Sequence, residues 1–231
     1  QAGYSDIIIG PEQIPHPESN FRVEATKPIH NRDELRQQDG LTYNEIFEHN
    51  SYQTLRSEIE GKTVVDIGAS LGMFSLRAIE LGAARVISIE PQLQCFQQLA
   101  HNVVQYPIEI MNKAVIDVSD QTVLISNEHV GSKVGNVGDP VKTISLLDVY
   151  NVFQIVGPAV LKLDCEGSEY DIVMTAHQEF LRLFEIIYIE VHTASHTNPL
   201  YHGLMTIDNK IASSGFELKH NVQQKWYPQG I

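Results

Sequence analysis

The sequence has few cysteines and few positive charges. Cys95 and Cys165 are the only cysteines among 231 residues, and their spacing gives neither a disulfide framework nor a cysteine-based metal site. Against 29 Asp and Glu residues there are only 16 Lys and Arg residues, so the formal net charge is -13. The average field of such a chain repels nucleic-acid phosphates and anionic lipid head groups. We therefore expect no nucleic-acid partner.

Long apolar runs are also absent from the sequence. No run approaches the roughly 20 residues that span a bilayer, so we expect no membrane insertion. The N-terminus lacks the basic-then-apolar pattern of a secretory signal peptide. Together with the two isolated cysteines, this favours a reducing compartment, and we expect a cytoplasmic protein. The length and the 42% hydrophobic composition suit one α/β domain with an appendage.

The first 60 residues differ in pattern from the rest of the chain. Four prolines in the first 40 residues oppose helix and central strand, so we expect an extended arm there, with a short edge strand at 5–9. Apolar residues at helical spacing over 42–60, interrupted near Asn50, predict two short helices. We therefore divide the chain into an N-terminal arm and helical cap, 1–60, and a main domain, 61–231.

In the main domain, short apolar runs alternate with helical stretches. This alternation predicts a Rossmann-like α/β fold, with helices flanking a seven-stranded, mostly parallel sheet. The segments 123–126 and 141–144 are predicted to pair as a hairpin through a glycine-containing linker. The seven strands of the predicted sheet are 63–67, 85–89, 108–111, 159–163, 186–191, 216–219 and 224–227.

The first predicted strand carries Asp66 and runs into a turn with Gly68 and Gly72. A dinucleotide site needs a further glycine between these two, where the backbone approaches a pyrophosphate, but Ser70 stands there. Glu90 ends the next strand, where a carboxylate can accept hydrogen bonds from both ribose hydroxyls. The pattern favours a phosphate-free adenosyl cofactor, S-adenosylmethionine, with Asp66 acting on its ammonium group directly or through water.

A less specific interpretation is that the two glycines only shape a tight turn and that Glu90 is a solvated strand end. We favour the cofactor site because the carboxylates and glycines occur together. The residues expected to form it are Asp66, Gly68, Ala69, Ser70, Gly72, Phe74, Glu90, Pro91 and Asn112.

Three segments of the chain resemble the successive motifs of the FkbM-type methyltransferases. They are Val-Asp-Ile-Gly-Ala-Ser-Leu-Gly at 65–72, Ile-Glu-Pro at 89–91 and Leu-Lys-Leu-Asp-Cys-Glu-Gly-Ser-Glu at 161–169. The likeness runs over residues 43–190, and its most distinctive part is Lys-x-Asp-x-Glu-Gly-x-Glu. The resemblance implies a class I methyltransferase fold and S-adenosylmethionine-dependent O-methylation, commonly of sugar or secondary-metabolite hydroxyls. Ser70 departs from the family, which usually has Asn there, although both side chains form hydrogen bonds.

Candidate catalytic residues follow the fourth and fifth strands of the predicted sheet. Ligands of open α/β sheets bind beyond the carboxyl ends of the strands, so Asp164 is expected to face the transferred methyl group. A hydroxyl acceptor gains from a base, and Asp164 and a neutral His192 are the candidates, with Glu166 as a further catalytic residue. Alternatively, His192 bonds to backbone, while Glu166 and Glu169 only stabilise a helix start.

Three further hypotheses carry less support from the sequence. A divalent metal bound by Glu190, His192, His196 and His202 matches no ligand motif, so we predict no metal. An NAD(P)-dependent oxidoreductase is disfavoured by Ser70 and by the absence of a Tyr-x-x-x-Lys pair. A non-catalytic module that binds an adenosyl cofactor stays open. The expected partner is a small-molecule or carbohydrate acceptor.

Overall fold

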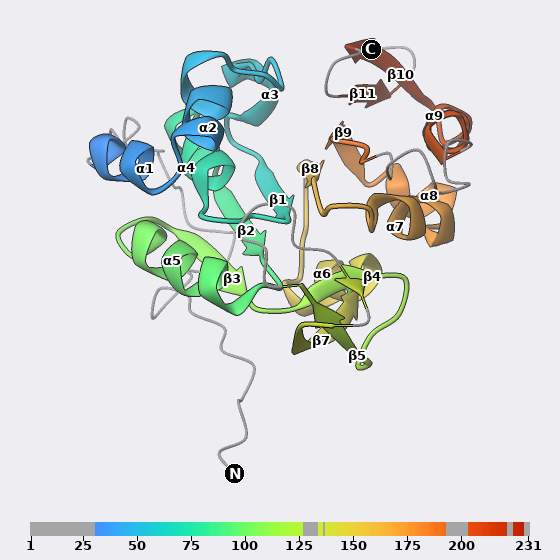
Figure 1. Ribbon diagram of the computed structural model, residues 1–231. Coiled ribbons are helices and arrows are strands. Elements are labelled where there is room, and N and C mark those ends of the chain that lie inside the picture. The colour runs from blue at the N-terminus through green and yellow to red at the C-terminus, as the bar shows by residue number, and fades with distance from the viewer. Residues whose placement is uncertain (1–30, 127–133, 136, 193–202, 221–223, 229–231) are drawn as a thin grey trace.

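A seven-stranded sheet forms the centre of the computed structural model, which describes residues 31–126, 134–135, 137–192, 203–220 and 224–228. The strand order is β10-β11-β9-β8-β1-β2-β3 (Figure 1). The pairs from β9 to β3 are parallel, and β11 pairs antiparallel with both β9 and β10. The strands are β1 (Thr63–Ile67), β2 (Arg85–Ile89), β3 (Ile108–Met111), β8 (Ala159–Leu163), β9 (Phe184–Ile189), β10 (Phe216–His220) and β11 (Gln224–Pro228).

Helices cover both faces of this sheet, because alternate strand residues point to opposite faces. Val64 of β1 and Val160 of β8 join a hydrophobic cluster with α4, α5 and the N-terminal helices. Val65 and Leu161, the next residues, pack in a second cluster with α6, α7, α8 and α9 on the opposite face. The helices are α1 (Arg32–Gln38), α2 (Gly40–Tyr43), the π-helix η1 (Asn44–Glu48), α3 (Arg56–Ile59), α4 (Met73–Glu80), α5 (Leu93–Val103), α6 (Leu146–Val152), α7 (Glu169–Thr175), α8 (Gln178–Leu181) and α9 (Gly203–Ser213).

The strand order reverses between β1 and β8, which are neighbours in the sheet but far apart in sequence. Their last residues, Ile67 and Leu163, pair in register, and the amide of Asp164 donates to the Ile67 carbonyl at 3.1 Å. The loops that follow the two strands therefore leave the sheet side by side. In open α/β sheets, such a reversal opens a crevice at the carboxyl ends of the strands, where ligands bind.

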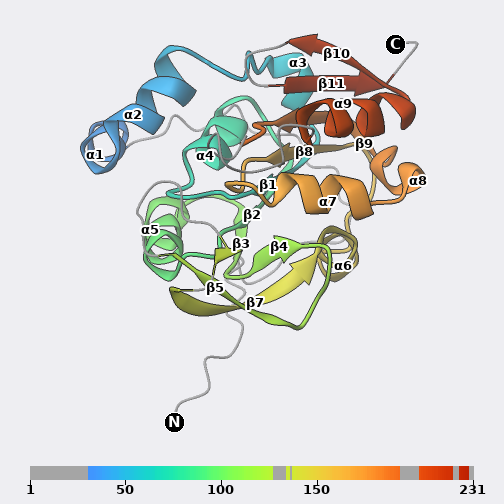
Figure 2. The ribbon, with the colours of Figure 1, turned by 45° about the vertical axis from the view of Figure 1, so that its right-hand side comes forward.

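A second, smaller sheet lies beside the central one and has the order β4-β7-β5-β6 (Figure 2). Its strands β5 (Thr122–Ile125) and β7 (Asp139–Ser145) pair antiparallel, which confirms the predicted hairpin. The strands β4 (Ala114–Ile116) and β6 (Val134–Gly135) complete it and were not predicted. The predicted count of seven strands therefore describes only the larger sheet.

The N-terminal region corrects one prediction. Residues 32–38 form helix α1 instead of an extended arm, because the prolines precede it and Leu35 is fully buried against the core. Ion pairing of Arg32 with Glu80 and hydrogen bonds between Gln38 and Asn102 hold α1 to α4 and α5. The predicted break near residue 50 separates η1 from α3. The predicted edge strand at 5–9 lies outside the described residues.

Within the described part of the chain, no helix combines the length and the apolar composition that crossing a bilayer requires.

Replacing Leu99 by Ala is expected to lower the free energy of unfolding by about 2–5 kcal/mol, because α5 would lose methyl groups that are fully buried. Val104→Ala is the matched control. That side chain is 71% exposed just beyond α5, and the change should be less than about 0.5 kcal/mol. Urea denaturation followed by circular dichroism measures both. Equal losses of unfolding free energy in the two variants would contradict the burial of Leu99 against the core.

Candidate functional site

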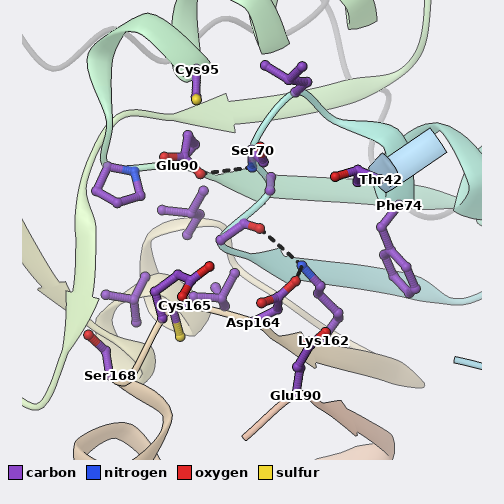
Figure 3. Close-up of a pocket in the computed structure, with 18 of the residues that line it drawn as sticks. Thr42, Ser70, Phe74, Glu90, Cys95, Lys162, Asp164, Cys165, Ser168 and Glu190 are labelled. Carbon is purple, nitrogen blue, oxygen red and sulfur yellow. Dashed lines mark hydrogen bonds and ion pairs between the residues drawn. The ribbon is translucent and has the colours of Figure 1, made fainter. Parts of the chain in front are cut away.

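A cavity opens at the carboxyl ends of β1, β2 and β8, at the reversal of strand order. Its wall includes the turn after β1 and the residues that follow β2 and β8. The N-terminal region contributes Thr42 from α2, Glu45 from η1 and Tyr52 from the turn between η1 and α3. Figure 3 shows Glu90 on one side of this cavity and Asp164 on the other. Of the predicted cofactor residues, those that line the cavity are Gly68, Ala69, Ser70, Phe74, Glu90 and Pro91.

The turn after β1 needs glycine at Gly68 for space as well as for conformation. Its φ is +75°, and a Cβ atom there would lie 1.7 Å from the carbonyl oxygen of Asp164. Gly72 has a φ of +87°, and a Cβ atom there would lie 2.6 Å from Leu99 Cδ1. Gly68 therefore lets two loops meet at the cavity, whereas Gly72 lets α5 pack against the turn without lining the cavity.

Glu90 is held on the cavity wall by backbone donors. Its two carboxylate oxygens accept the amides of Ser70 and Gln92, each at 2.8 Å. The side chain is only 6% exposed, and this burial raises the pKa of Glu90 to about 7, although the two amides counteract the shift. Asn112 donates to the carbonyls of Glu90 and Pro91 at 2.8 and 2.9 Å, so this predicted cofactor residue fixes the backbone behind Glu90.

Lys162 connects the turn after β1 with the loop after β8. Its buried ammonium group donates to the Gly68 carbonyl at 3.0 Å and lies 3.1 Å from Asp164 Oδ2 and 3.3 Å from Asp66 Oδ1. Burial opposes the charge, but Asp164 and Asp66 outweigh it and raise the pKa of Lys162. We did not predict Lys162 as a site residue. Its position inside a predicted buried strand could have indicated this role, because a buried ammonium group requires anionic partners nearby.

Asp66 lies beneath the cavity wall and has no exposed surface. Its Oδ2 atom accepts a hydrogen bond from Ser75 at 2.6 Å, and its Oδ1 atom faces Lys162. The enclosed carboxylate disfavours the predicted direct contact of Asp66 with the ammonium group of the cofactor, whereas the alternative contact through water stays a prediction. Lys162, 3.3 Å from Asp66 Oδ1, connects this carboxylate to the residues of the cavity wall.

Tyr52, in the turn between η1 and α3, reaches the side of the cavity that carries Asp164 and Glu190. Its hydroxyl oxygen lies 3.1 Å from Asp164 Oδ2 and 3.0 Å from Glu190 Oε2. The side chain is 2% exposed and packs edge-on against the rings of Phe74 and Tyr188. Burial and the neighbouring carboxylates raise the pKa of Tyr52 well above its usual range, so the hydroxyl stays a donor. In the sequence, Tyr52 was only one of the apolar residues at helical spacing over 42–60, and it was not predicted as a site residue.

His192 lies among carboxylates. Its Nδ1 atom is 3.0 Å from Glu169 Oε1, and its Nε2 atom is 3.7 Å from Asp164 Oδ1 and 3.6 Å from Glu166 Oε2. Burial would lower the pKa of His192, but Glu169, Asp164 and Glu166 outweigh it and raise the pKa to about 9. At neutral pH the ring is an imidazolium. The prediction of a neutral His192 acting as base is therefore corrected.

Glu169 matches the helix-start interpretation and has a second role. Its carboxylate is 1% exposed and accepts the amides of Cys165 and Gly167 at 2.6 and 2.9 Å, and it also binds His192. Donor atoms of Asp164, Glu169 and His192 lie within 4.8 Å of one another, as in a metal site. A divalent ion there would have to displace these contacts of Glu169. His196 and His202, named in the weaker metal hypothesis, lie outside the described residues.

The variant Gly68→Ala tests the close approach of the two loops. It is expected to destabilise the fold by well over the roughly 1–2 kcal/mol that a left-handed alanine costs, because its methyl group would overlap the Asp164 carbonyl. Gly61→Ala is the matched control, since Gly61 has a similar φ of +74° and open space around it. Thermal unfolding measures both variants. Equal shifts of the midpoint would mean that the overlap does not exist.

Comparison with known proteins identifies the family. A model described as "Methyltransferase FkbM domain" matches residues 66–216. A comparison with curated proteins gives no match. Among solved structures, the chain is similar to the FkbM methyltransferase of Methylobacillus flagellatus KT, with 19% identity over 72% of this chain and 43% of that chain and a TM-score of 0.46.

Two other solved structures are similar at comparable levels. Aeropyrum pernix fibrillarin, with natively bound S-adenosyl-L-methionine, has 14% identity over 73% of this chain and 66% of that chain, with a TM-score of 0.44. The ribosomal protein L11 methylase of Lactobacillus delbrueckii subsp. bulgaricus has 13% identity over 74% of this chain and 71% of that chain, with a TM-score of 0.39. The assignment depends on the family match and on the sheet order. This chain belongs to the FkbM methyltransferase family, with the class I methyltransferase fold and S-adenosylmethionine as its cofactor.

Proposed function

We propose that this protein transfers a methyl group from S-adenosylmethionine to a hydroxyl group of a sugar, a glycan or a secondary metabolite. One observation carries the proposal. A single cavity joins a glycine turn and a ribose-type carboxylate, Gly68 and Glu90, to a cluster of hydrogen-bonding side chains at the next strands. The first part suits the methyl donor, and the second suits a hydroxyl acceptor.

The residues at the Glu90 side fit an adenosyl cofactor. Because the amides of Ser70 and Gln92 fix the Glu90 carboxylate, it is oriented in advance for a ribose diol. Gly68 and Ala69 bring the backbone of the turn to the cavity wall, and Pro91 and Val115 add apolar surface to the cavity. When bound, the cofactor supplies a methyl group on a positively charged sulfur.

The opposite side of the cavity fits an acceptor that has several hydroxyl groups. Asp164, Glu166 and Glu190 offer carboxylate oxygens that accept hydrogen bonds, and the His192 imidazolium donates. Such groups can hold a hydroxyl in line with the methyl group, which supplies much of the acceleration of a displacement. A wall rich in carboxylates also disfavours a phosphate backbone, which supports a small-molecule or carbohydrate acceptor over a nucleic acid.

The geometry of the turn argues further against NAD(P). A pyrophosphate would need the free amides of the turn, but the Ser70 amide already donates to Glu90 Oε2. When ionised, the same carboxylate would repel a phosphate group placed there. A protein that binds the adenosyl cofactor without catalysis is the remaining alternative, and the site residues His192, Asp164 and Glu190 favour catalysis because a binding module has no need of them.

Calorimetry and turnover test the proposed function together. S-adenosylhomocysteine should bind with measurable heat, whereas NAD should not. With S-adenosylmethionine, a panel of monosaccharides, oligosaccharides and polyketide alcohols should release S-adenosylhomocysteine with at least one member. Binding of NAD alone would overturn the cofactor assignment. Binding of S-adenosylhomocysteine with transfer only to an amine, a thiol or carbon would overturn O-methylation.

Glu90→Ala is expected to weaken the binding of S-adenosylhomocysteine about tenfold or more, because two hydrogen bonds from ribose hydroxyls to a carboxylate would be lost. Glu179→Gln, on the exposed surface of α8, removes the same charge far from the cavity and should leave the affinity unchanged. Calorimetry gives both dissociation constants, and circular dichroism checks the fold. Unchanged affinity in Glu90→Ala would mean that the ribose lies elsewhere.

The affinity for S-adenosylhomocysteine should also depend on pH through Glu90. Only the ionised carboxylate accepts from both ribose hydroxyls, and its pKa is about 7. Affinity should therefore be constant at alkaline pH and fall by up to about tenfold per pH unit below about pH 7. Calorimetry across this range measures the dependence. It should vanish in Glu90→Ala, and a dependence that persists there would assign the titration to another group.

A further inference from the structure

We propose that Glu190 is the base that takes the proton of the acceptor hydroxyl, and that Tyr52 positions it. The inference rests on the proposed methyl transfer and names the residue that activates its acceptor. Neither side chain was a predicted catalytic residue, because Glu190 had been considered only as a metal ligand.

The sheet places Glu190 beside Asp164 at the cavity. Ile189 of β9 pairs in register with Leu163 of β8, so the next residues of the two strands leave the sheet together. The Glu190 amide donates to the Leu163 carbonyl at 2.9 Å, which fixes its backbone. Its side chain is 34% exposed and lines the cavity together with Asp164, as Figure 3 shows. Glu190 therefore combines a fixed backbone with access to a ligand.

Tyr52 fixes the carboxylate of Glu190. The phenol ring packs edge-on against Phe74 and Tyr188, with ring centroids 5.4 and 6.2 Å away, so the hydroxyl has a defined position. This hydroxyl has one proton and two carboxylate neighbours at about equal distance, Asp164 and Glu190. It can donate to only one of them at a time. A proton that arrives on Glu190 can thus be accommodated, because Tyr52 can then donate to Asp164.

The other candidate bases are less suitable. Asp164 Oδ2 lies 3.1 Å from the buried ammonium group of Lys162, a permanent positive charge that favours the ionised carboxylate. His192 carries its proton at neutral pH. Glu169 is enclosed by two backbone amides and His192. Of the groups compared here, Glu190 is the one whose surroundings favour proton uptake.

The charges around Glu190 agree with this role. Burial and the negative charges of Asp164 and Glu45 raise the pKa of Glu190, whereas the Tyr52 hydroxyl and His192 lower it. The groups that raise the pKa have the larger effect, so Glu190 is a stronger base than a carboxylate in water.

The proposed step is balanced without a further reactant. The acceptor O–H bond breaks and its proton binds a carboxylate oxygen of Glu190. The acceptor oxygen forms a bond to the methyl carbon, and the bond from that carbon to sulfur breaks with its electron pair remaining on sulfur. The proton then leaves Glu190 for water through the open part of the cavity.

Glu190→Gln tests the base directly with the acceptor found in the panel. General base catalysis contributes about 100-fold or more, so kcat should fall by that factor while S-adenosylhomocysteine affinity stays unchanged. Glu185→Gln, at the opposite end of β9 where it pairs with Lys62, is the matched control and should keep full kcat. A Glu190→Gln enzyme with nearly normal kcat would overturn the proposal. Wild-type protein that fails to bind S-adenosylhomocysteine would refute the proposed function instead.

Tyr52→Phe distinguishes positioning from a merely structural role. Loss of the hydroxyl raises the pKa of Glu190 further, so the acid limb of the kcat profile should move to higher pH. A second readout needs no acceptor: carbon-13 NMR of carboxyl-labelled glutamate in the S-adenosylhomocysteine complex. The resonance missing in Glu190→Gln should titrate above the usual pKa of about 4.3 and move upward in Tyr52→Phe. The proposal would be overturned if this resonance titrated with a midpoint of about 4.3 and the midpoint did not change in Tyr52→Phe.

Discussion

The ammonium group of Lys162 is the contact on which the site depends. It reaches the carbonyl of Gly68, the carboxylate of Asp164 and the enclosed carboxylate of Asp66 at once. A charge buried this deeply is stable only while its partners stay in place, so each of them is held by the same group. Lys162 thereby fixes the turn after β1 against the loop after β8. Lys162 and Asp164 also line the cavity, so these ion pairs form part of its wall.

Each side of the cavity carries a carboxylate, the buried Glu90 and the partly exposed Glu190, with different partners. Glu90 is held by two backbone amides, which leaves it rigid and suited to bind a diol. Glu190 is held by a tyrosine hydroxyl that can turn to Asp164, which leaves it able to take up a proton. Burial raises the pKa of both groups. In the proposed mechanism, the hydrogen-bond partners of each carboxylate therefore suit Glu90 to binding and Glu190 to proton uptake.

Local patterns in the sequence predicted the strands well. The bounds of β1, β2, β3 and β8 match the predictions because these strands are short, buried runs rich in apolar residues, and a glycine or an acidic residue directly follows β1, β2 and β8. Helix α1 was missed because the prolines before it dominated the composition of the first 40 residues, although Leu35 anchors the helix.

The sequence predicted cavity residues only where they belong to a recognisable motif, as Gly68 and Glu90 do. The contacts of Tyr52 with residues 112 and 138 positions away depend on the tertiary fold, and so does the charge on His192. The most direct test of the account is a crystal structure with S-adenosylhomocysteine. It should place both ribose hydroxyls on Glu90 and the sulfur toward Asp164 and Glu190. Ribose away from Glu90, or sulfur turned from these carboxylates, would contradict it.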